Sequence, residues 1–333
     1  MARAEPGYRP RQDILDKFPE ISGNTVNGLG EAEWRPPAPF FWHPPDKQTH
    51  GELQQYIVSQ FRPSSIEDRS FRNPAVDRGP ELVAVATERQ TDSAEQWTGS
   101  IKDFVLADEA DLVGITPVTA ENVYTGYEIA EPTLVMIGVA HDYERLAQAP
   151  GSPENPDAYY DLHDQYNRAA RVAARLTNHI RSLGYNATPF LGPMGGALNM
   201  IPAAIAAGFG ELGKHGSMIN RTYGSGFRLS AVATDLPLLA DTPDSFGAGD
   251  FCLNCQVCAT ACPPGAITHT KQTVRGESKW YVDFDACIPY FGEHMACGIC
   301  IAVCPYTRPG VAPRLIEKMA RRAASEDGDR RTL

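Results

Sequence analysis

Several features are missing from this chain of 333 residues, and each absence narrows its class. The first 251 residues contain no cysteine, and all eight cysteines lie between Cys252 and Cys304. No apolar run approaches the length of a membrane span, and the N-terminus has neither a paired-arginine motif nor the apolar core of an export signal. We therefore expect a soluble, cytoplasmic protein without a membrane span.

The chain also has fewer basic than acidic residues. The chain has 41 acidic and 30 basic residues, a formal net charge of −11. This excess of negative charge opposes tight binding to a phosphate backbone, so it disfavours nucleic acid as a partner. Eight cysteines in a large chain that we expect to be intracellular favour metal binding over disulfides.

The uneven cysteine distribution indicates more than one domain, and the length favours two. We expect a proline-rich, irregular arm and the start of the core in residues 1–100, followed by an α/β domain in residues 101–246. A cysteine-rich domain should occupy residues 247–310, and a helix with a charged tail residues 311–333. The arm contains WRPPAPFFWHPP from Trp34 and shows no clean period, so it should pack irregularly on the surface.

The middle of the chain has an α/β pattern. Two short apolar runs rich in β-branched residues, at residues 111–116 and 133–141, predict buried strands. Residues 164–183 carry an apolar stripe at helical spacing, and Gly184 supplies a C-terminal stop. We predict a short helix at residues 202–209. A strand at residues 227–235 should place Arg228 on the same face as Ser230, Val232 and Thr234.

The stretch FCLNCQVCATACP, which begins at Phe251, places four cysteines at intervals of three, three and four residues. A four-iron cluster needs four converging thiolates, and one CxxCxxC loop can supply three of them. The fourth cysteine of such a run, which precedes a proline, ligates a second cluster. The later stretch CIPYFGEHMACGICIAVCP again ends in Cys-Pro. Reciprocal exchange predicts cluster one on Cys252, Cys255, Cys258 and Cys304, and cluster two on Cys262, Cys287, Cys297 and Cys300.

Zinc is the main alternative to iron and sulfide. Zinc sites usually pair two CxxC units about 15 to 20 residues apart, and they do not carry CxxCxxCxxxCP. None of the CxxC units is followed by histidine, which excludes haem attachment. The spacing therefore indicates two 4Fe-4S clusters. The insertion IPYFGEHMA between Cys287 and Cys297 departs from a small ferredoxin, and we expect it to form a bulge beside cluster two.

With that departure, the chain resembles the reductive dehalogenases and, more distantly, the epoxyqueuosine reductases. The matching segments are ADLVGI at Ala110, IRSLGYNATP at Ile180, IPAAIAAGFGELGKHG at Ile201, INRTYGSGFRLSAVATDLPL at Ile219, and both cysteine clusters. The resemblance implies an α+β protein. A nitroreductase-like α/β corrinoid-binding domain would be followed by a two-cluster bacterial ferredoxin-like domain.

The resemblance also implies cobalamin bound between the two domains, with cluster two nearby. The sequence lacks the DxHxxG arrangement by which many cobalamin proteins ligate cobalt, because DLHDQY at Asp161 ends in tyrosine where glycine is needed. We therefore expect a corrinoid without a histidine ligand from the protein. The residues expected to contact it are Gly208, Gly210, Lys214, Gly216, Ser217, Met218, Ile219, Leu229 and Thr234. Each of these glycines could instead serve only a turn, and Lys214 could be a solvated lysine.

Two side chains carry the chemistry that the resemblance implies. Tyr166 matches the tyrosine that precedes the LGYNA helix end, and Arg228 matches the basic residue after the YG turn. Replacing halogen by hydrogen needs two electrons and one proton. An adjacent guanidinium stabilises a phenolate, so Tyr166 is the expected general acid and Arg228 its electrostatic partner. From the residues alone, Tyr166 could be an ordinary core tyrosine, and His163 and His215 are interpreted as structural.

The predicted function is reductive dehalogenation of an organohalide, with a halogenated aromatic as the expected substrate. No reductase domain is fused to the chain, so a separate ferredoxin or flavodoxin is the expected electron donor. An epoxyqueuosine reductase is the first alternative, although FLGPMGGALNMIP lacks the carboxylate of that family's segment. A non-catalytic corrinoid or electron-transfer protein is the second.

Overall fold

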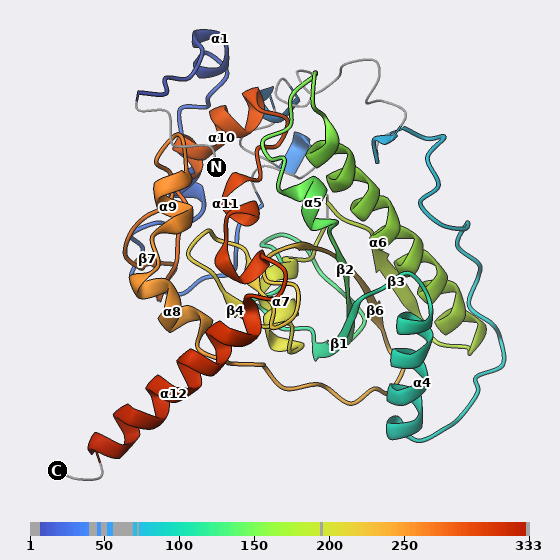
Figure 1. Cartoon of the computed structure of the whole chain (residues 1–333). Helices are drawn as coiled ribbons and strands as arrows, with labels where there is room; N and C mark the ends of the chain where they lie inside the picture. The colour runs from blue at the N-terminus through green and yellow to red at the C-terminus, as the bar shows by residue number, and fades with distance from the viewer. Residues whose placement is uncertain are drawn as a thin grey trace.

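Four antiparallel strands form the central sheet, in the order β1-β2-β6-β3. The computed structural model describes residues 7–39, 45–47, 52–55, 69–71, 73–193 and 196–330. Strands β2 and β6 are the inner pair, and their register places Val139 opposite Arg228 (Figure 1). The strands are β1 (Leu112–Pro117), β2 (Thr133–Ala140), β3 (Ala187–Phe190) and β6 (Phe227–Thr234).

The sheet lies between two apolar cores, as its sequence pattern requires. The long helix α6 (Asp157–Ser182) and helix α4 (Ala94–Ala107) cover one face, where Val135, Ile137 and Val232 are buried. The short helix α7 (Met200–Ala206) packs on the opposite side with Leu134, Met136, Ala231 and Ala233. Because β2 is covered on both faces, its sequence is a continuous apolar run rather than an alternating one.

The predicted strands at 111–116, 133–141 and 227–235 are confirmed to within one residue, and the helix at 202–209 lies at Met200–Ala206. Helix α6 begins at Asp157 rather than at Asp164, and the turn Gly184 has a φ of +86°. A Cβ at Gly184 would lie 2.4 Å from the carbonyl oxygen of Glu88. The expected glycine stop is therefore present and is required by a close backbone approach.

Helix α4 was not predicted. Its N-cap is Ser93, whose side chain accepts a hydrogen bond from the backbone N–H of Gln96. Trp97, Ile101 and Val105 form its buried stripe. The domain boundary expected at residue 101 therefore falls inside this helix.

The cysteine-rich part of the chain is built from short helices and one hairpin beside the sheet domain (Figure 1). Its order is α8 (Ala248–Asn254), α9 (Val257–Ala261), β7 (Gln272–Val274), β8 (Glu277–Lys279), α10 (Phe284–Glu293), α11 (Ile299–Ala302) and η3 (Pro305–Thr307). The longer helix α12 (Ala312–Arg330) follows it.

The insertion between Cys287 and Cys297 is mostly helical, so the expected bulge is corrected. It forms most of α10, which begins before Cys287 because the Asp283 side chain accepts from the backbone N–H of Ala286 at 3.0 Å. The chain then turns back through a left-handed stretch, in which Met295, Ala296 and Cys297 have φ values of +46°, +66° and +44°.

The N-terminal arm packs on the cysteine-rich domain. It contains helices α1 (Gln12–Leu15) and α2 (Gly23–Val26). The Asn24 side chain accepts from the Tyr281 hydroxyl at 2.7 Å and donates to Asp283 at 2.8 Å. Ile14 and Leu53 are fully buried in a cluster with Ile288. The aromatic residues Phe40, Phe41 and Trp42 lie outside the described residues.

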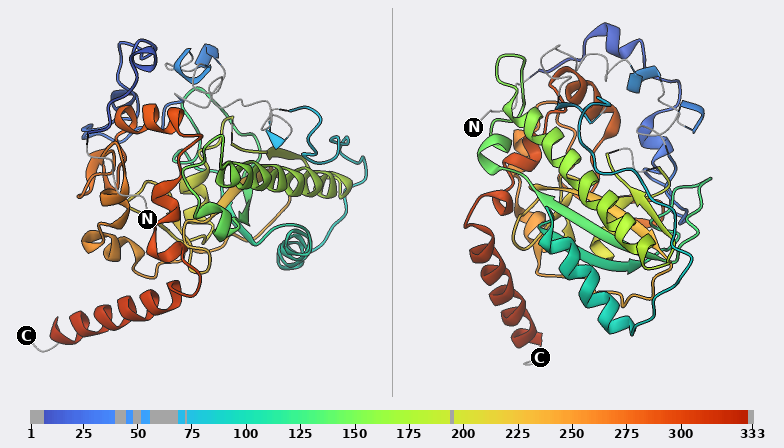
Figure 2. Two further views of the ribbon diagram at one scale, coloured as in Figure 1. Left: turned by 45° about the horizontal axis from the view of Figure 1, so that its top comes forward. Right: turned by 90° about the vertical axis from the view of Figure 1, so that its right-hand side faces the viewer.

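Helix α12 extends away from the rest of the molecule in both orientations of Figure 2, and the described C-terminus lies at its far end. It contacts α8 and η3 of the body. Within the described ranges, neither α12 nor any other helix is long and apolar enough to cross a membrane.

Candidate functional site

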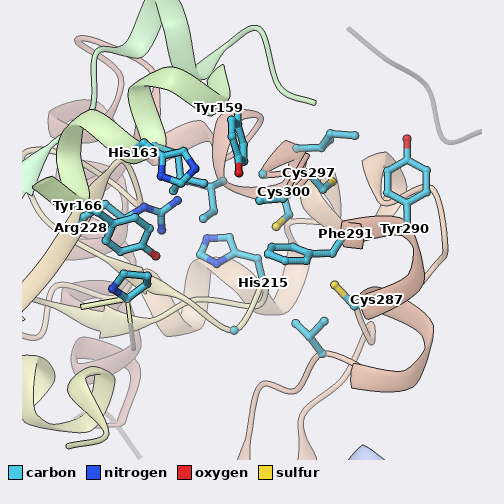
Figure 3. A pocket seen from close by; sticks show the side chains of 18 of the residues that line it. Tyr159, His163, Tyr166, His215, Arg228, Cys287, Tyr290, Phe291, Cys297 and Cys300 are labelled. Atoms are coloured by element: carbon cyan, nitrogen blue, oxygen red, sulfur yellow. The ribbon is translucent and has the colours of Figure 1, made fainter. Parts of the chain in front are cut away.

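A cavity of about 720 Å³ lies between the sheet domain and the cysteine-rich domain. Helix α6 supplies Tyr159, His163 and Tyr166 to one wall, and the start of β6 supplies Arg228. The opposite wall contains Cys287, Cys297 and Cys300 (Figure 3), and Cys262 also lines the cavity. The volume of the cavity is within the range of small-molecule and cofactor sites. The cavity therefore brings the predicted acid, its basic partner and the predicted cluster-two cysteines together.

Tyr166 and Arg228 are direct neighbours. The Arg228 guanidinium carbon lies 5.4 Å from the centre of the Tyr166 ring, a cation–π distance. Arg228 Nε is buried and has no hydrogen-bond partner within the described part of the chain. A buried donor without a partner is costly, so this side chain is set up to meet an acceptor that enters the cavity.

The backbone beside Tyr166 is held by another arginine. Arg78 donates to the carbonyl oxygens of Phe71 at 3.0 Å and of Gly192 at 2.8 Å. Gly192 has a φ of +52°, and a Cβ there would lie 2.9 Å from the Leu229 carbonyl oxygen and 3.9 Å from the Tyr166 ring. A glycine is thus needed where this loop passes between α6 and β6.

The eight cysteines form the two sets that reciprocal exchange predicts. A small second hollow is lined by Cys252, Cys255, Cys258 and Cys304. The other four line the main cavity. None of the eight is in a disulfide. In the described ranges, no group of three or more His, Cys, Asp or Glu side chains is arranged to hold a single metal ion. The assignment to two four-iron clusters stays a prediction that this placement supports.

Burial dominates the chemistry of these thiols. It raises the pKa of Cys252 and Cys297 to about 11 and that of Cys258 and Cys287 to about 12. Thiolates are the ligands of iron, so binding a cluster must displace these protons. Backbone N–H groups of Gly265, Ala266 and Ile267 point at the Cys262 sulfur and partly offset the burial. Converging thiols with amide donors suit the residues to an iron–sulfur cluster.

His215 separates the two hollows and lines both. Its Nδ1 accepts from the backbone N–H of Ser217 at 3.2 Å, so its proton is on Nε2, 2.9 Å from the Ser225 hydroxyl oxygen. That hydroxyl donates to the Met218 carbonyl at 2.6 Å. Burial lowers the pKa of His215 to about 4, which keeps the ring neutral near pH 7. His163 also lines the cavity, packed between Phe71 and Tyr159.

The residues expected to contact the corrinoid are divided by the structure. Gly216 lines the main cavity, and Ile219 lines the smaller hollow. Gly208 and Gly210 have left-handed backbones packed against the carbonyl oxygens of Thr242 and Ile219. The remaining expected contacts do not line the main cavity in the described part of the chain. They are Gly208, Gly210, Lys214, Ser217, Met218, Leu229 and Thr234. Their role as corrinoid contacts stays a prediction.

Sequence reasoning missed a buried pair behind Arg228. His141 Nδ1 pairs with a carboxylate oxygen of Asp161, and both side chains are almost fully buried. Burial lowers the pKa of His141, and the charge of Arg228 lowers it further. The aspartate of this pair is the first residue of DLHDQY, a segment interpreted above only as an incomplete cobalt-ligating motif. Tyr290 and Phe291 of α10 also line the cavity, whereas His294 stacks on Tyr290.

Comparison with known proteins agrees with this arrangement. A family model described as a 4Fe-4S dicluster domain matches residues 251–307. The chain is 32% identical over 282 residues to a tetrachloroethene reductive dehalogenase of Sulfurospirillum multivorans, covering 80% of this chain and 53% of that protein. It is 30% identical over 226 residues to the epoxyqueuosine reductase of Escherichia coli, covering 58% of each.

Two solved structures are also similar. One is a reductive dehalogenase described as B12-dependent, with a TM-score of 0.64, 26% identity, and coverage of 80% of this chain and 38% of that one. The other is a catabolic reductive dehalogenase in complex with 3-bromo-4-hydroxybenzoic acid, with a TM-score of 0.64, 25% identity, and coverage of 83% and 40%.

The chain spans about half the length of the first curated relative, at 53%, and about 40% of the second solved structure. Within that span it has the mixed helix and sheet fold of the reductive dehalogenases, followed by the dicluster domain. The chain is therefore a homologue of the reductive dehalogenases that carries a 4Fe-4S dicluster domain, and the epoxyqueuosine reductases are its more distant relatives.

Proposed function

We propose that this chain carries out cobalamin-dependent reductive dehalogenation of an organohalide, with halogenated aromatics as the expected substrates. The observation that carries the proposal is a single cavity lined by Tyr166 and Arg228 of the sheet domain and by four cysteines of the dicluster domain. Relatives that act on tetrachloroethene, and a similar structure that holds a bromohydroxybenzoic acid, support it.

The reaction balances simply. The carbon–halogen bond breaks, a carbon–hydrogen bond forms, and two electrons and one proton are consumed while halide leaves. Bound cobalamin would supply low-valent cobalt for cleavage of the carbon–halogen bond, and the two clusters would supply the electrons singly. The chain's own residues must then position the substrate, deliver the proton and exclude water.

Tyr166 is the proton donor in this proposal, and its hydroxyl oxygen is the atom that holds the proton. Its ring is fixed by Arg228 on one side and by Phe71, whose ring centre is 5.9 Å away, on another. A guanidinium beside the phenol stabilises the phenolate that remains after the proton leaves. Aromatic side chains around the cavity, including Phe71, Tyr159 and Phe291, favour a flat apolar substrate.

Arg228 has a second role. Its buried Nε lacks a partner in the described part of the chain, and its guanidinium borders the cavity. It can therefore attract an anionic group of the substrate or the departing halide. Both are acceptors for a charged donor, and such charge-assisted hydrogen bonds are about twice as strong as neutral ones.

The proposal keeps the corrinoid free of a histidine ligand from the protein. Both ring nitrogens of His215 are already hydrogen-bonded. His163 Nδ1 accepts from the backbone N–H of Phe71 at 3.4 Å, so a neutral His163 carries its proton on Nε2 and has no lone pair there to offer a metal. These are the described histidines that line the cavity. A nitroreductase-like topology for the corrinoid domain, and a separate ferredoxin or flavodoxin as electron donor, belong to the same proposal.

The test is halide release by anaerobically reconstituted protein with cobalamin, on a panel of bromo- and chlorophenols. Tyr166→Phe should lower kcat by at least about 100-fold, since a positioned general acid contributes that much or more. It should keep both clusters and the corrinoid absorption spectrum. Tyr160→Phe is the matched control, because Tyr160 is on the same helix but does not border the cavity, and its activity should match the unsubstituted chain.

Full activity in Tyr166→Phe would remove the proposed proton donor. Zinc in place of iron, or failure to take up any corrinoid, would contradict the function itself. Turnover of an epoxyqueuosine-modified tRNA stem loop without any halide release would favour the more distant relatives, despite the net charge of −11.

A further inference from the structure

Lys214 is a fully buried lysine that the proposed reaction does not use. It follows β4 (Glu211–Leu212), on the dicluster side of the sheet domain. Its ammonium lies 3.1 Å from the Gln256 side-chain oxygen and 3.3 Å from the His269 carbonyl oxygen, and 4.8 Å from the centre of the Trp280 ring. It is not among the residues that line the main cavity.

These three neighbours all offer electron density to a donor. The two oxygens accept hydrogen bonds, and an aromatic face attracts a cation. Gln256 is fixed in this orientation because its side-chain oxygen also meets His269 Nδ1 at 2.6 Å. The site therefore offers the lysine side chain two hydrogen-bond acceptors and an aromatic face.

No carboxylate of the described residues pairs with Lys214 in an ion pair of 4.0 Å or less. Taking an ammonium out of water without an anion costs several kcal/mol. Folds keep such charges where an anion or a metal group compensates them. An anion must therefore be sought among the groups beside this lysine.

That anion is the four-cysteine hollow. The backbone N–H of Lys214 donates to the Cys252 sulfur, and the charge of the Lys214 side chain acts on Cys252 and Cys258. Gln256, which holds the ammonium, lies within the same CxxCxxC loop. A four-iron cluster with four thiolates is negatively charged in both of its working states.

The second set of cysteines has different neighbours. Three charged or ionisable groups act on Cys287. Two are the cysteines Cys262 and Cys297, and the third is the carboxylate of Asp283, the N-cap of α10. The charge of Glu211 also acts on Tyr306 of the first hollow, and Arg228 lines the cavity that holds the second set, so the feature particular to the first hollow is a fully buried ammonium. Net charge near a cluster is one of the quantities that set its reduction potential.

We propose that Lys214 is the counter-charge of cluster one and raises its reduction potential. The inference rests on the assignment of the cysteines under the proposed function. Reduction adds one negative charge to the cluster, and a buried ammonium stabilises that charge more than water would.

The test is an anaerobic redox titration of the full holoprotein followed by electron paramagnetic resonance. Lys214→Gln and Lys214→Met remove the charge, and Lys214→Arg retains it. Lys271→Gln is the matched control, because Lys271 is exposed and its ammonium lies 5.8 Å from the same Trp280 ring. Iron content is measured for every variant, separately from halide release.

In the neutral variants, one of the two signals should move to lower potential. The equilibrium constant for electron transfer between the clusters should change about tenfold, which corresponds to ~59 mV for a one-electron couple. Lys214→Arg and Lys271→Gln should titrate like the unsubstituted chain. If the neutral variants lose one cluster while Lys214→Arg keeps both, the charge is still what matters.

Unchanged potentials in the neutral variants would overturn the proposal. So would loss of a cluster in Lys214→Arg, which would show that the shape of the side chain, and not its charge, is required. Absence of both clusters from the unsubstituted chain would instead contradict the proposed function.

Discussion

At the scale of single residues, the buried carboxylate of Asp161 has its hydrogen-bond partners away from Arg228, whose charge acts on His141. Asp161 lies behind Arg228 and is already occupied by His141, by Gln165 at 2.9 Å and by the backbone N–H of Asp142. Burial alone would raise the pKa of Asp161, but these hydrogen bonds lower it below its ordinary value. The carboxylate therefore serves His141 and leaves the guanidinium of Arg228 for the cavity.

His141 provides a pH-dependent prediction. Its folded-state pKa is lowered, first by burial and then by Arg228, whereas the unfolded chain takes up a proton near pH 6.5. The unfolded state thus binds more protons as the pH falls below about 6.5, so stability is lost in that direction. Arg145 and Asp161 are the other charged groups acting on this ring.

His141→Asn retains a donor toward Asp161 but removes the titrating ring. Its melting temperature should fall less steeply between pH 7.5 and 5.5 than that of the unsubstituted chain. The difference corresponds to at most about 1.4 kcal/mol per pH unit, the value for one proton. Anaerobic thermal unfolding followed by circular dichroism measures it, and parallel pH profiles would disprove the role of His141.

At the scale of elements, one long helix and one inner strand position the reacting side chains. Helix α6 carries Tyr166, and β6 carries Arg228 on the face that also holds Ser230, whose hydroxyl donates to the Ala169 carbonyl at 2.8 Å. This bond joins strand to helix close to Tyr166. The pair is thus set on rigid elements, which hold catalytic geometry better than loops do.

The loop before β6 also joins the two parts of the molecule. Gly224 has a φ of +56°, and a Cβ there would lie 2.4 Å from backbone atoms of Tyr306 and Thr307. The next residue, Ser225, donates its backbone N–H to the Thr307 hydroxyl at 3.0 Å. Any side chain at position 224 would push the dicluster domain away from the sheet.

Gly224→Ala should therefore destabilise the protein by about 2–4 kcal/mol, because a clash with fixed backbone is added to the cost of the left-handed conformation. Gly126→Ala is the control, since Gly126 has a φ of +80° with nothing within 4 Å of its added Cβ. It should cost only about 1–2 kcal/mol. Melting temperatures compare the two, and equal losses would show that the contact with Tyr306 is not important.

At the scale of the whole molecule, the cavity exists only because two domains and the N-terminal arm meet. The arm is tied to the dicluster domain by Asn24 and Asp285, the latter accepting from the backbone N–H of Gly23 at 2.9 Å. The arm thereby supports α10, whose Tyr290 and Phe291 close one side of the cavity. Residues far apart in the chain thus enclose one site.

Crossed ligation of the clusters is a prediction at the same scale. Cys287→Ser and Cys262→Ser should remove the same electron paramagnetic resonance signal and about half of the iron, because both cysteines are assigned to cluster two. Cys304→Ser should remove the other signal. If Cys304→Ser instead removes the same signal as Cys287→Ser, and Cys262→Ser removes the other, each motif holds its own cluster and the exchange is wrong.

The sequence by itself determined the inner strands, the stripe of α6 and the two cysteine motifs, because these features follow from local periodicity and ligand spacing. It also singled out Tyr166 and Arg228, through a resemblance to a family. The start of α6, helix α4 and the helical form of α10 needed more than a local pattern, since side-chain caps and packing set them. Only the tertiary structure brought His141 to Asp161 and Lys214 to the first cysteine loop. Such pairs bring together side chains far apart in sequence, and burial, which depends on every neighbour at once, gives them their chemistry.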